Sequence, residues 1–163
     1  MELAQAVLAA ARSRGWTLAT AESCTGGLLG AALTEVPGSS DVYERGFITY
    51  ANQAKQEMLG VVPQLIAAHG AVSSQTAAAM AEGALRASPA DLAVSVTGIA
   101  GPGGGSPTKP VGLVWLATAT RGQTARPVER LYGDLGRSGV REAAVRTALE
   151  LLLEQLQTGS GAP

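Results

Sequence analysis

Small polar residues follow an apolar run near the start of the chain, and their types suit nucleophilic chemistry. Glu22, Ser23 and Cys24 come directly after the apolar run 16–21, and the apolar positions of 28–36 then recur at helical spacing. A turn from a strand into a helix leaves backbone N–H groups free at the positive end of the helix dipole. Such a turn holds an anion or presents a nucleophile. It also occurs where serine or threonine only caps a helix, and Ala21 stands where a G-x-S-x-G nucleophile elbow has glycine.

Two lysines are the candidate general bases. The chain has ten arginines but only Lys55 and Lys109, and both lie in or beside loops that leave apolar strands. Burial lowers the pKa of a lysine enough for it to act as a base, and a Ser–Lys pair activates a hydroxyl without histidine. Lys55 is equally compatible with a solvated charge on a short helix. The single histidine, His69, precedes Gly70 at the predicted end of a helix, so we expect it to be structural.

Three loops carry the polar residues and are predicted to converge on one pocket. They are the segments 22–25, 50–55 and 97–101, and each follows an apolar strand. In open α/β sheets, ligands bind outside the carboxyl ends of the strands. The glycine-rich stretch 98–110 is neither a P-loop nor a Rossmann fingerprint, because its spacing fits neither motif.

Tyr50 and Thr97 are further candidates at these strand ends. Tyr50 would relay a proton or orient a substrate. Alternatively, it is a core tyrosine whose hydroxyl reaches solvent. Thr97 together with the N–H groups of Gly98 and Ile99 would form an oxyanion site.

The composition favours one globular domain and excludes several classes of protein. The chain has 163 residues, of which 46% are hydrophobic, and a net charge of -1 from 12 basic and 13 acidic residues. No apolar run approaches the roughly 18 residues of a membrane span, and residues 1–14 do not resemble a signal peptide, so we expect a cytoplasmic protein without membrane contact. No basic stripe points to nucleic acid. One cysteine and one histidine exclude an internal disulfide and argue against a metal site.

The order of predicted elements indicates an α/β fold. After a first helix we expect a strand at 16–21, a helix at about 25–36 and a strand at 47–50. Helices at about 53–59, 63–69 and 75–87 then lead to a buried strand at 92–97. Two consecutive strands, 111–120 and 126–132, then precede a final helix that contains Val140 and Leu152. This order predicts a single-domain, three-layer helix–sheet–helix sandwich with a mixed sheet. We expect the domain to span 1–157 and a flexible tail to span 158–163.

Five short segments, in order, resemble one known family. They are AESCTGG (21–27), GFITYANQAK (46–55), HGAVS (69–73), VTGIAGP (96–102) and KPVG (109–112). Together they are similar to the C-terminal domain of the CinA competence/damage-inducible family, and the resemblance covers about 3–156. That domain also exists as a stand-alone nicotinamide-nucleotide amidase. Longer members carry an additional N-terminal domain, which these residues do not include.

The resemblance implies hydrolysis of the carboxamide of nicotinamide mononucleotide to nicotinate mononucleotide and ammonia, without a metal or cofactor. The catalytic residues of the family fall on Ser23, Tyr50, Lys55 and Thr97. We therefore expect Ser23 to attack and Lys55 to take its proton, directly or through Tyr50, with an oxyanion held by N–H groups near Ser23 or Gly98. Cys24 is the rival nucleophile, because a thiolate is reactive at a helix N-terminus.

Contacts to substrate are expected at eight further positions. They are Glu22, Thr25, Gly26, Gly98, Gly101, Lys109, Arg137 and Arg141. A phosphate requires cationic or N–H partners, and Arg141, Arg137, Lys109 or a helix start would supply them. The Gly-Asp-Arg pattern of the family is interrupted here, since Leu135 and Gly136 separate Asp134 from Arg137.

Two other expectations come with the resemblance. The competence and damage associations of the family also fit a non-catalytic nucleotide-binding or interaction module. The family favours a homo-oligomer, with a dimer preferred, and a small nucleotide rather than nucleic acid as the partner.

Overall fold

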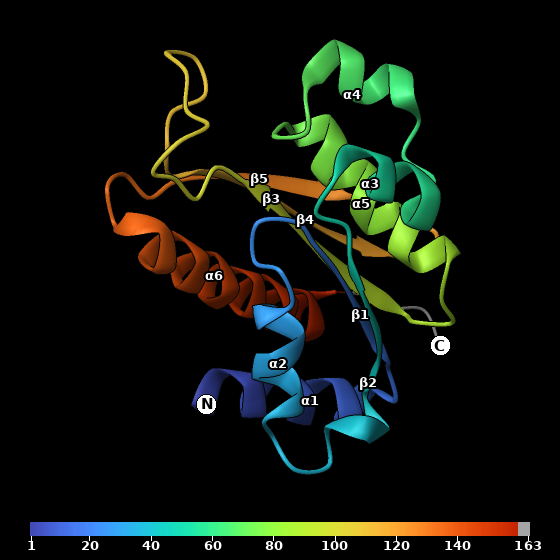
Figure 1. The fold of residues 1–163 in the computed structure, drawn as a ribbon. Helices are drawn as coiled ribbons and strands as arrows, with labels where there is room; N and C mark the ends of the chain where they lie inside the picture. The colour runs from blue at the N-terminus through green and yellow to red at the C-terminus, as the bar shows by residue number, and fades with distance from the viewer. Residues whose placement is uncertain (160–163) are drawn as a thin grey trace.

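A five-stranded mixed sheet lies between two layers of helices in the computed structural model, which describes residues 1–159 (Figure 1). Its strands are β1 Leu18–Glu22, β2 Tyr43–Ile48, β3 Leu92–Gly98, β4 Leu113–Thr120 and β5 Arg126–Leu131. The order is β2-β1-β3-β4-β5, with β1 parallel to β2 and β3, and with β4 antiparallel to β3 and β5. The predicted three-layer sandwich with a mixed sheet is confirmed.

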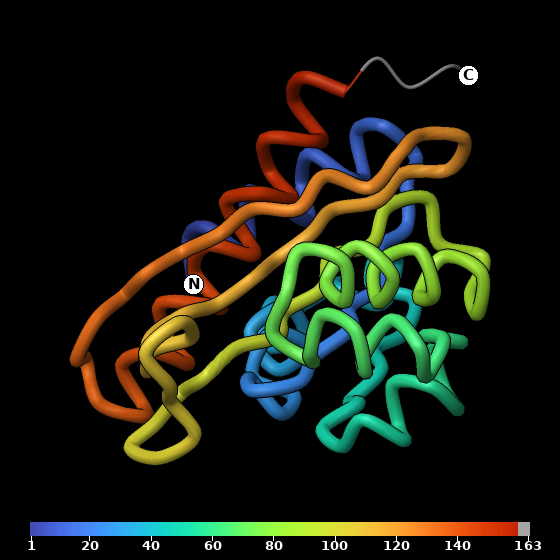
Figure 2. The backbone as a smooth tube through the Cα atoms, turned by 90° about the horizontal axis from the view of Figure 1, so that it is seen from above, coloured from blue at the N-terminus to red at the C-terminus, as the bar shows by residue number. Residues whose placement is uncertain are grey.

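The helices divide into two layers, each with its own apolar core. One face is covered by α1 Glu2–Arg14, α2 Leu28–Thr34 and α6 Gly136–Thr158. The other face is covered by α3 Asn52–Leu59, α4 Pro63–His69 and α5 Ser74–Arg86, and a short turn of 3-10 helix, Ser39–Asp41, precedes β2. Seen from above, α6 runs along one side of the β4–β5 hairpin and α4 and α5 lie on the other (Figure 2). The two layers therefore approach the strand ends from opposite faces.

Two element boundaries differ from the sequence expectation. Helix α2 begins at Leu28, because Gly26 and Gly27 have φ values of 58° and 104°, which a right-handed helix does not allow. Strand β2 begins at Tyr43 rather than at Phe47. The apolar pattern missed its first residues because Glu44 and Arg45 are charged, as is common on an edge strand. Of the predicted tail 158–163, Thr158 is instead the last residue of α6, and residues 160–163 lie outside the described part of the chain.

No helix within residues 1–159 is both long and apolar enough to cross a membrane.

Candidate active site

Three hydroxyl residues lie in a row where the parallel strands end. Strand β1 pairs in register with both of its neighbours up to Glu22, so the residues that follow these pairs, Ser23, Thr49 and Thr97, are neighbours across the sheet. Side chains alternate between the faces of a strand, and Ala21, two residues before Ser23, belongs to the core beneath α5. The three hydroxyl residues therefore face the α3–α5 layer.

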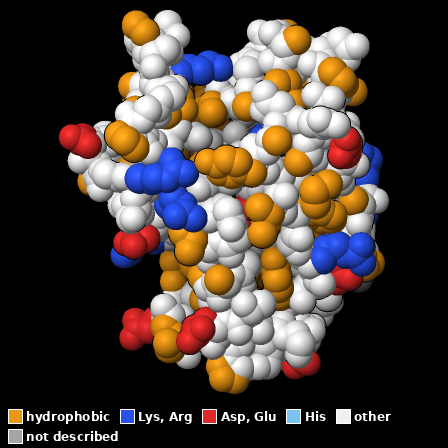
Figure 3. Space-filling view, viewed as in Figure 1, with side chains coloured by type: hydrophobic (Ala, Val, Ile, Leu, Met, Phe, Trp, Pro, Cys, Tyr) orange, Lys and Arg blue, Asp and Glu red, His pale blue; other side chains and the backbone are white. Residues whose placement is uncertain are grey.

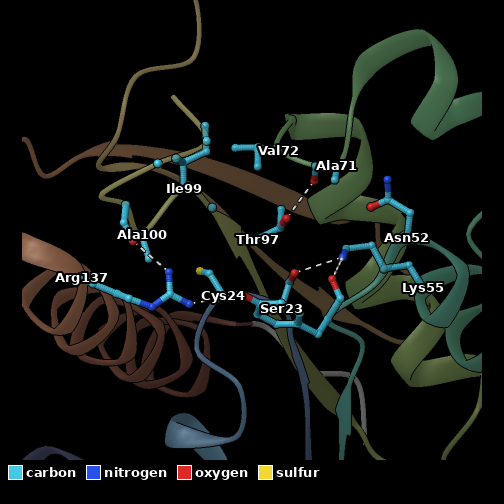
Figure 4. A pocket seen from close by; sticks show the side chains of 15 residues that line it. Ser23, Cys24, Asn52, Lys55, Ala71, Val72, Thr97, Ile99, Ala100 and Arg137 are labelled. Atoms are coloured by element: carbon cyan, nitrogen blue, oxygen red, sulfur yellow. Dashed lines mark hydrogen bonds between the residues drawn. The ribbon is translucent and has the colours of Figure 1, made fainter. Parts of the chain in front are cut away.

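Lys55 on α3 lies directly over this row. Its Nζ is 3.0 Å from Ser23 Oγ, and it donates to the backbone oxygens of Thr49 at 2.9 Å and Tyr50 at 3.1 Å (Figure 4). Only 1% of Lys55 is exposed, although lysine is one of the residues least often buried. The reading of Lys55 as a solvated surface charge is wrong.

The contacts of Lys55 suit a neutral amine as well as an ammonium group. Burial holds the pKa of Lys55 below its usual value of 10.5, because desolvation disfavours the charged form. The oxygens of Thr49 and Tyr50 only accept hydrogen bonds. When Nζ is neutral, its two N–H groups remain on these oxygens, and its lone pair faces Ser23 Oγ. This is the arrangement that a general base for Ser23 requires.

Glu22 fixes the turn that carries Ser23. It is 2% exposed, and its carboxylate accepts from the backbone N–H groups of Gly27, Leu29 and Gly30 at 3.2, 2.9 and 3.0 Å. A carboxylate at a helix N-terminus satisfies orphan N–H groups and complements the helix dipole. Glu22, which we expected to contact substrate, thus has its oxygens occupied by the start of α2.

Free backbone N–H groups flank Ser23. Within residues 1–159 the N–H of Cys24 makes no backbone hydrogen bond. Ile99, which we expected to help hold an oxyanion, donates its N–H to Leu113 O at 2.9 Å, so this N–H is not available. Hydrogen bonding to one neighbour alternates along an antiparallel strand, so Gly98 directs its N–H toward the other side, where Ser23 lies.

Thr97 lies beside Ser23 and is itself held in place. Its hydroxyl donates to Ala71 O at 2.8 Å, and the residue is 1% exposed. The bond joins β3 to the link between α4 and α5, which forms one wall of the site (Figure 4).

Arg137, in the first turn of α6, reaches across the mouth of the site. Its Nη1 donates to Gly101 O at 2.9 Å and its Nη2 to the hydroxyl of Tyr50 at 3.1 Å. Tyr50 is 61% exposed and is therefore not a core residue. The backbone carbonyl of Tyr50 accepts a hydrogen bond from Lys55. Its side-chain hydroxyl contacts Arg137, so the side chain lies at the mouth of the site.

Arg141, one turn further along α6, is tied to the Ser23 turn. Its Nε donates to Cys24 O and its Nη2 to Thr25 O, both at 3.1 Å. Basic side chains lie over the start of α6, which contains arginines and no lysine, in the space-filling view (Figure 3). Thr25 is fully buried and Gly26 lies over Arg141, so both belong to this support.

Lys109 lies away from the Ser23–Lys55 pair. Its Nζ donates to His69 O at 2.6 Å and so joins the glycine-rich loop to the end of α4. His69 is the last residue of that helix and Gly70 follows it, as the sequence predicted.

The thiol of Cys24 is a poor nucleophile in this setting. Burial raises its pKa to about 11, because desolvation disfavours the thiolate, and only 6% of the residue is exposed. At neutral pH this thiol is protonated.

A pocket of about 260 Å³ lies above the Ser23–Lys55 pair. Ser23, Lys55, Tyr50, Thr97, Gly98, Gly101 and Arg137 line it; Glu22, Thr25, Gly26, Lys109 and Arg141 do not. Six further residues line the pocket, and we did not predict from the sequence that any of them contacts substrate. They are Asn52, Ala71, Val72, Ala100, Gly103 and Gly104. For Asn52 the sequence did hold a signal, because residues three apart on a helix share a face and Asn52 precedes Lys55 by three.

Comparison with known proteins places the chain in a family. Residues 1–156 match the model of the CinA C-terminal domain. The crystal structure of competence/damage inducible protein CihA from Agrobacterium tumefaciens superimposes with a TM-score of 0.93 at 55% identity, covering 96% of this chain and 94% of that one.

The chain belongs to the CinA C-terminal domain family. A relative from Escherichia coli K12, named nicotinamide-nucleotide amidohydrolase PncC, is 50% identical over 95% of this CinA domain and 93% of its own length. A CinA-like protein from Synechococcus sp. RCC307 is 54% identical over 94% of the domain, but the domain spans only 37% of that protein.

Residues 1–159 of this CinA domain contain no group of three or more His, Cys, Asp or Glu side chains that could hold a metal ion. The groups gathered at the strand ends are instead a hydroxyl, a buried amine, backbone N–H groups and a guanidinium.

Proposed function

We propose that the chain is an amidohydrolase that converts nicotinamide mononucleotide to nicotinate mononucleotide and ammonia. The observation that carries the proposal is the buried Lys55 amine 3.0 Å from Ser23 Oγ, since a Ser–Lys pair performs acyl transfer without histidine. The name of the Escherichia coli relative, which the chain matches over nearly its whole length, supports the choice of substrate.

In the first half of the proposed reaction, Ser23 Oγ attacks the carboxamide carbon and Lys55 Nζ takes the hydroxyl proton. The N–H groups of Cys24 and Gly98 stabilise the negative charge on the carboxamide oxygen, an interaction typically contributing about 2.7–4 kcal/mol for one such donor. The C–N bond then breaks as Lys55 gives its proton to the leaving nitrogen. The products of this half are ammonia and an ester on Ser23.

In the second half, water attacks the ester carbon and Lys55 takes a proton from it. The bond to Ser23 Oγ breaks, and Lys55 returns the proton to Ser23. The buried lysine thus serves as base and acid in both halves, which requires a pKa nearer to neutrality than that of a solvated lysine.

Substrate is positioned from the pocket mouth in this proposal. Arg137 binds the phosphate, because its guanidinium lines the pocket and a charge-assisted pair of hydrogen bonds fits a phosphate. Tyr50 and Gly101, which Arg137 already contacts, border the same end of the pocket. Thr97 holds the wall beside Ser23. We propose supporting rather than contacting roles for Glu22, Thr25, Gly26, Lys109 and Arg141.

The test is ammonia release from nicotinamide mononucleotide by the purified chain and two variants. Release is expected from the wild type and from Cys24→Ala, because the Cys24 thiol is protonated at neutral pH. Ser23→Ala is expected to release none. Release retained in Ser23→Ala but lost in Cys24→Ala would transfer the nucleophile to the thiol, and a folded wild type without release would favour the non-catalytic binding module.

Three expectations remain predictions. A homo-oligomer, with a dimer favoured, is checked by light scattering. A cytoplasmic location is checked by fractionation. Binding to nucleic acid, which we do not expect, is checked by a mobility shift at several salt concentrations.

A further inference from the structure

Asn52 is the one polar pocket residue whose position local structure does not explain. Asparagine is favoured at a helix N-cap, yet the N-cap of α3 is Ala51, and Asn52 is the first helical residue. Asn52 is exposed to solvent, its side chain makes no hydrogen bond to another residue of the described chain, and it lines the pocket together with Ser23 and Lys55. A carboxamide group without a protein partner thus lies in the wall of the pocket, where a substrate can reach it.

The position of Asn52 on α3 relates it to Lys55. Residues three apart on a helix lie on the same face, so Asn52 and Lys55 project toward the pocket together. Arg137 lies on the opposite side of the pocket, with Ser23 between (Figure 4). The pocket therefore has a cationic end at Arg137 and a neutral amide end at Asn52.

This polarity orients a bound carboxamide, given the proposed function on which the inference rests. With the phosphate at Arg137 and the carboxamide carbon at Ser23, the ring occupies the space between them. The carboxamide oxygen is taken by the N–H groups beside Ser23. The remaining substituent, the leaving nitrogen, then points toward Lys55, which must protonate it, and toward Asn52 on the same helical face.

We propose that Asn52 Oδ1 accepts a hydrogen bond from the leaving nitrogen and thereby selects primary carboxamides. The leaving nitrogen carries two N–H groups in the substrate and three as ammonia, and Lys55 interacts with it at one position only. Asn52 supplies a further acceptor without adding charge beside Lys55. An ester of the same acid has no N–H on its leaving group and gains nothing from this contact.

The test compares two substrates in three proteins. The substrates are nicotinamide mononucleotide and the methyl ester of nicotinate mononucleotide, and the proteins are the wild type, Asn52→Leu and Gln53→Leu. Asn52→Leu is expected to lower kcat/KM for the amide about 3- to 10-fold and to change that for the ester less than about 2-fold, which matches the loss of one neutral hydrogen bond. Gln53→Leu is the matched control, since Gln53 pairs with Glu57 on the outside of α3, and it should change neither value.

A second variant separates loss of the acceptor from a disturbance of the helix. Asn52→Asp keeps an acceptor oxygen at the same place and should restore most of the amide activity, when compared on the plateau of the pH profile. An equal fall for amide and ester in Asn52→Leu, or no fall for either, would overturn the inference while leaving the amidase intact. A wild type that hydrolyses neither substrate would overturn the inference together with the proposed function.

Discussion

At the scale of single residues, burial shifts the pKa values of two side chains of the candidate site in opposite directions. Burial lowers the pKa of Lys55 and raises that of Cys24, because in each case desolvation disfavours the charged form. A lowered pKa suits the amine to the proposed role of base, and a raised pKa makes the thiol a poor nucleophile. The same low-polarity surroundings therefore favour Ser23 over Cys24 in the proposed reaction.

Replacing Lys55 by methionine keeps the length of the side chain and removes the base. We expect Lys55→Met to lower kcat/KM about 10²- to 10⁴-fold, the range for loss of general acid–base catalysis. In the wild type, kcat/KM should rise with pH as Lys55 loses its proton, with a midpoint below 10.5. Ammonia release across the pH range measures both, and an unchanged profile in Lys55→Met would remove the lysine from the mechanism.

The pKa of Lys55 also predicts how stability depends on pH. Since its pKa is lower in the folded chain, the unfolded chain binds more protons between the folded pKa and 10.5. The free energy of unfolding of the wild type should therefore rise with pH over this window, relative to that of Lys55→Met. Urea unfolding of both proteins at several pH values tests the sign.

Thr49 offers a second residue-scale prediction, on stability alone. It is fully buried, and its Oγ1 has no hydrogen-bond partner within the described residues. An unpaired buried hydroxyl costs about 1–3 kcal/mol, and valine has the same shape without it. Thr49→Val should raise the free energy of unfolding by about 1 kcal/mol in urea unfolding. A lower free energy of unfolding would mean that the hydroxyl has a partner, such as a bound water.

The two lysines show what residue types alone predict. The scarcity of lysine singled out Lys55 and Lys109 equally, but Lys55 meets Ser23 and Lys109 bonds to His69 O. The difference depends on the register of α3 over the sheet, which packing against α5 sets and local sequence does not encode. The roles of Glu22 and Arg141 were missed for the same reason, since both act through backbone groups that become neighbours only on folding.

At the scale of elements, the position of Lys55 depends on how closely α3 approaches α5. A Cβ on Gly83 of α5 would lie 2.1 Å from the backbone oxygen of Leu59, at the end of α3. Gly83 thus permits a close approach of α5 and α3, and any larger residue at this position would push the two helices apart. Sequence patterns located both helices within one residue, but this close approach depends on a glycine that looks unfavourable in a helix.

Gly83→Ala tests this contact because two effects have opposite signs. At an open helical site the change would stabilise the protein by about 1 kcal/mol through helix propensity. Here we expect a loss of about 1–3 kcal/mol in the free energy of unfolding, as for other overpacked sites, and a fall in kcat as α3 moves Lys55 away from Ser23. Thermal unfolding and ammonia release measure the two. Stabilisation with full activity would show that α3 tolerates the shift.

At the scale of the whole molecule, the site is assembled from both helix layers. Lys55, Asn52 and Tyr50 belong to the α3 side, whereas Arg137 and Arg141 come from α6 on the other face of the sheet. The sequence predicted the sandwich and the edge at which the site lies. It did not predict that the first turn of α6 would reach Tyr50, since 87 residues separate the two contacting side chains.

The two arginines of α6 contact different parts of the site, so we expect their replacement to have different effects. Arg137 is exposed at the pocket mouth, so Arg137→Gln should leave the melting temperature nearly unchanged and raise KM for nicotinamide mononucleotide about 10- to 100-fold, as expected when a charge-assisted contact to phosphate is lost. Arg141 supports the Ser23 turn instead, so Arg141→Gln should lower stability and kcat. Nicotinamide riboside, which lacks the phosphate, provides the control. If Arg137→Gln impairs the riboside as much as the nucleotide, the guanidinium acts by holding Tyr50 and Gly101 and not by binding phosphate, because only the second role requires the phosphate to be present.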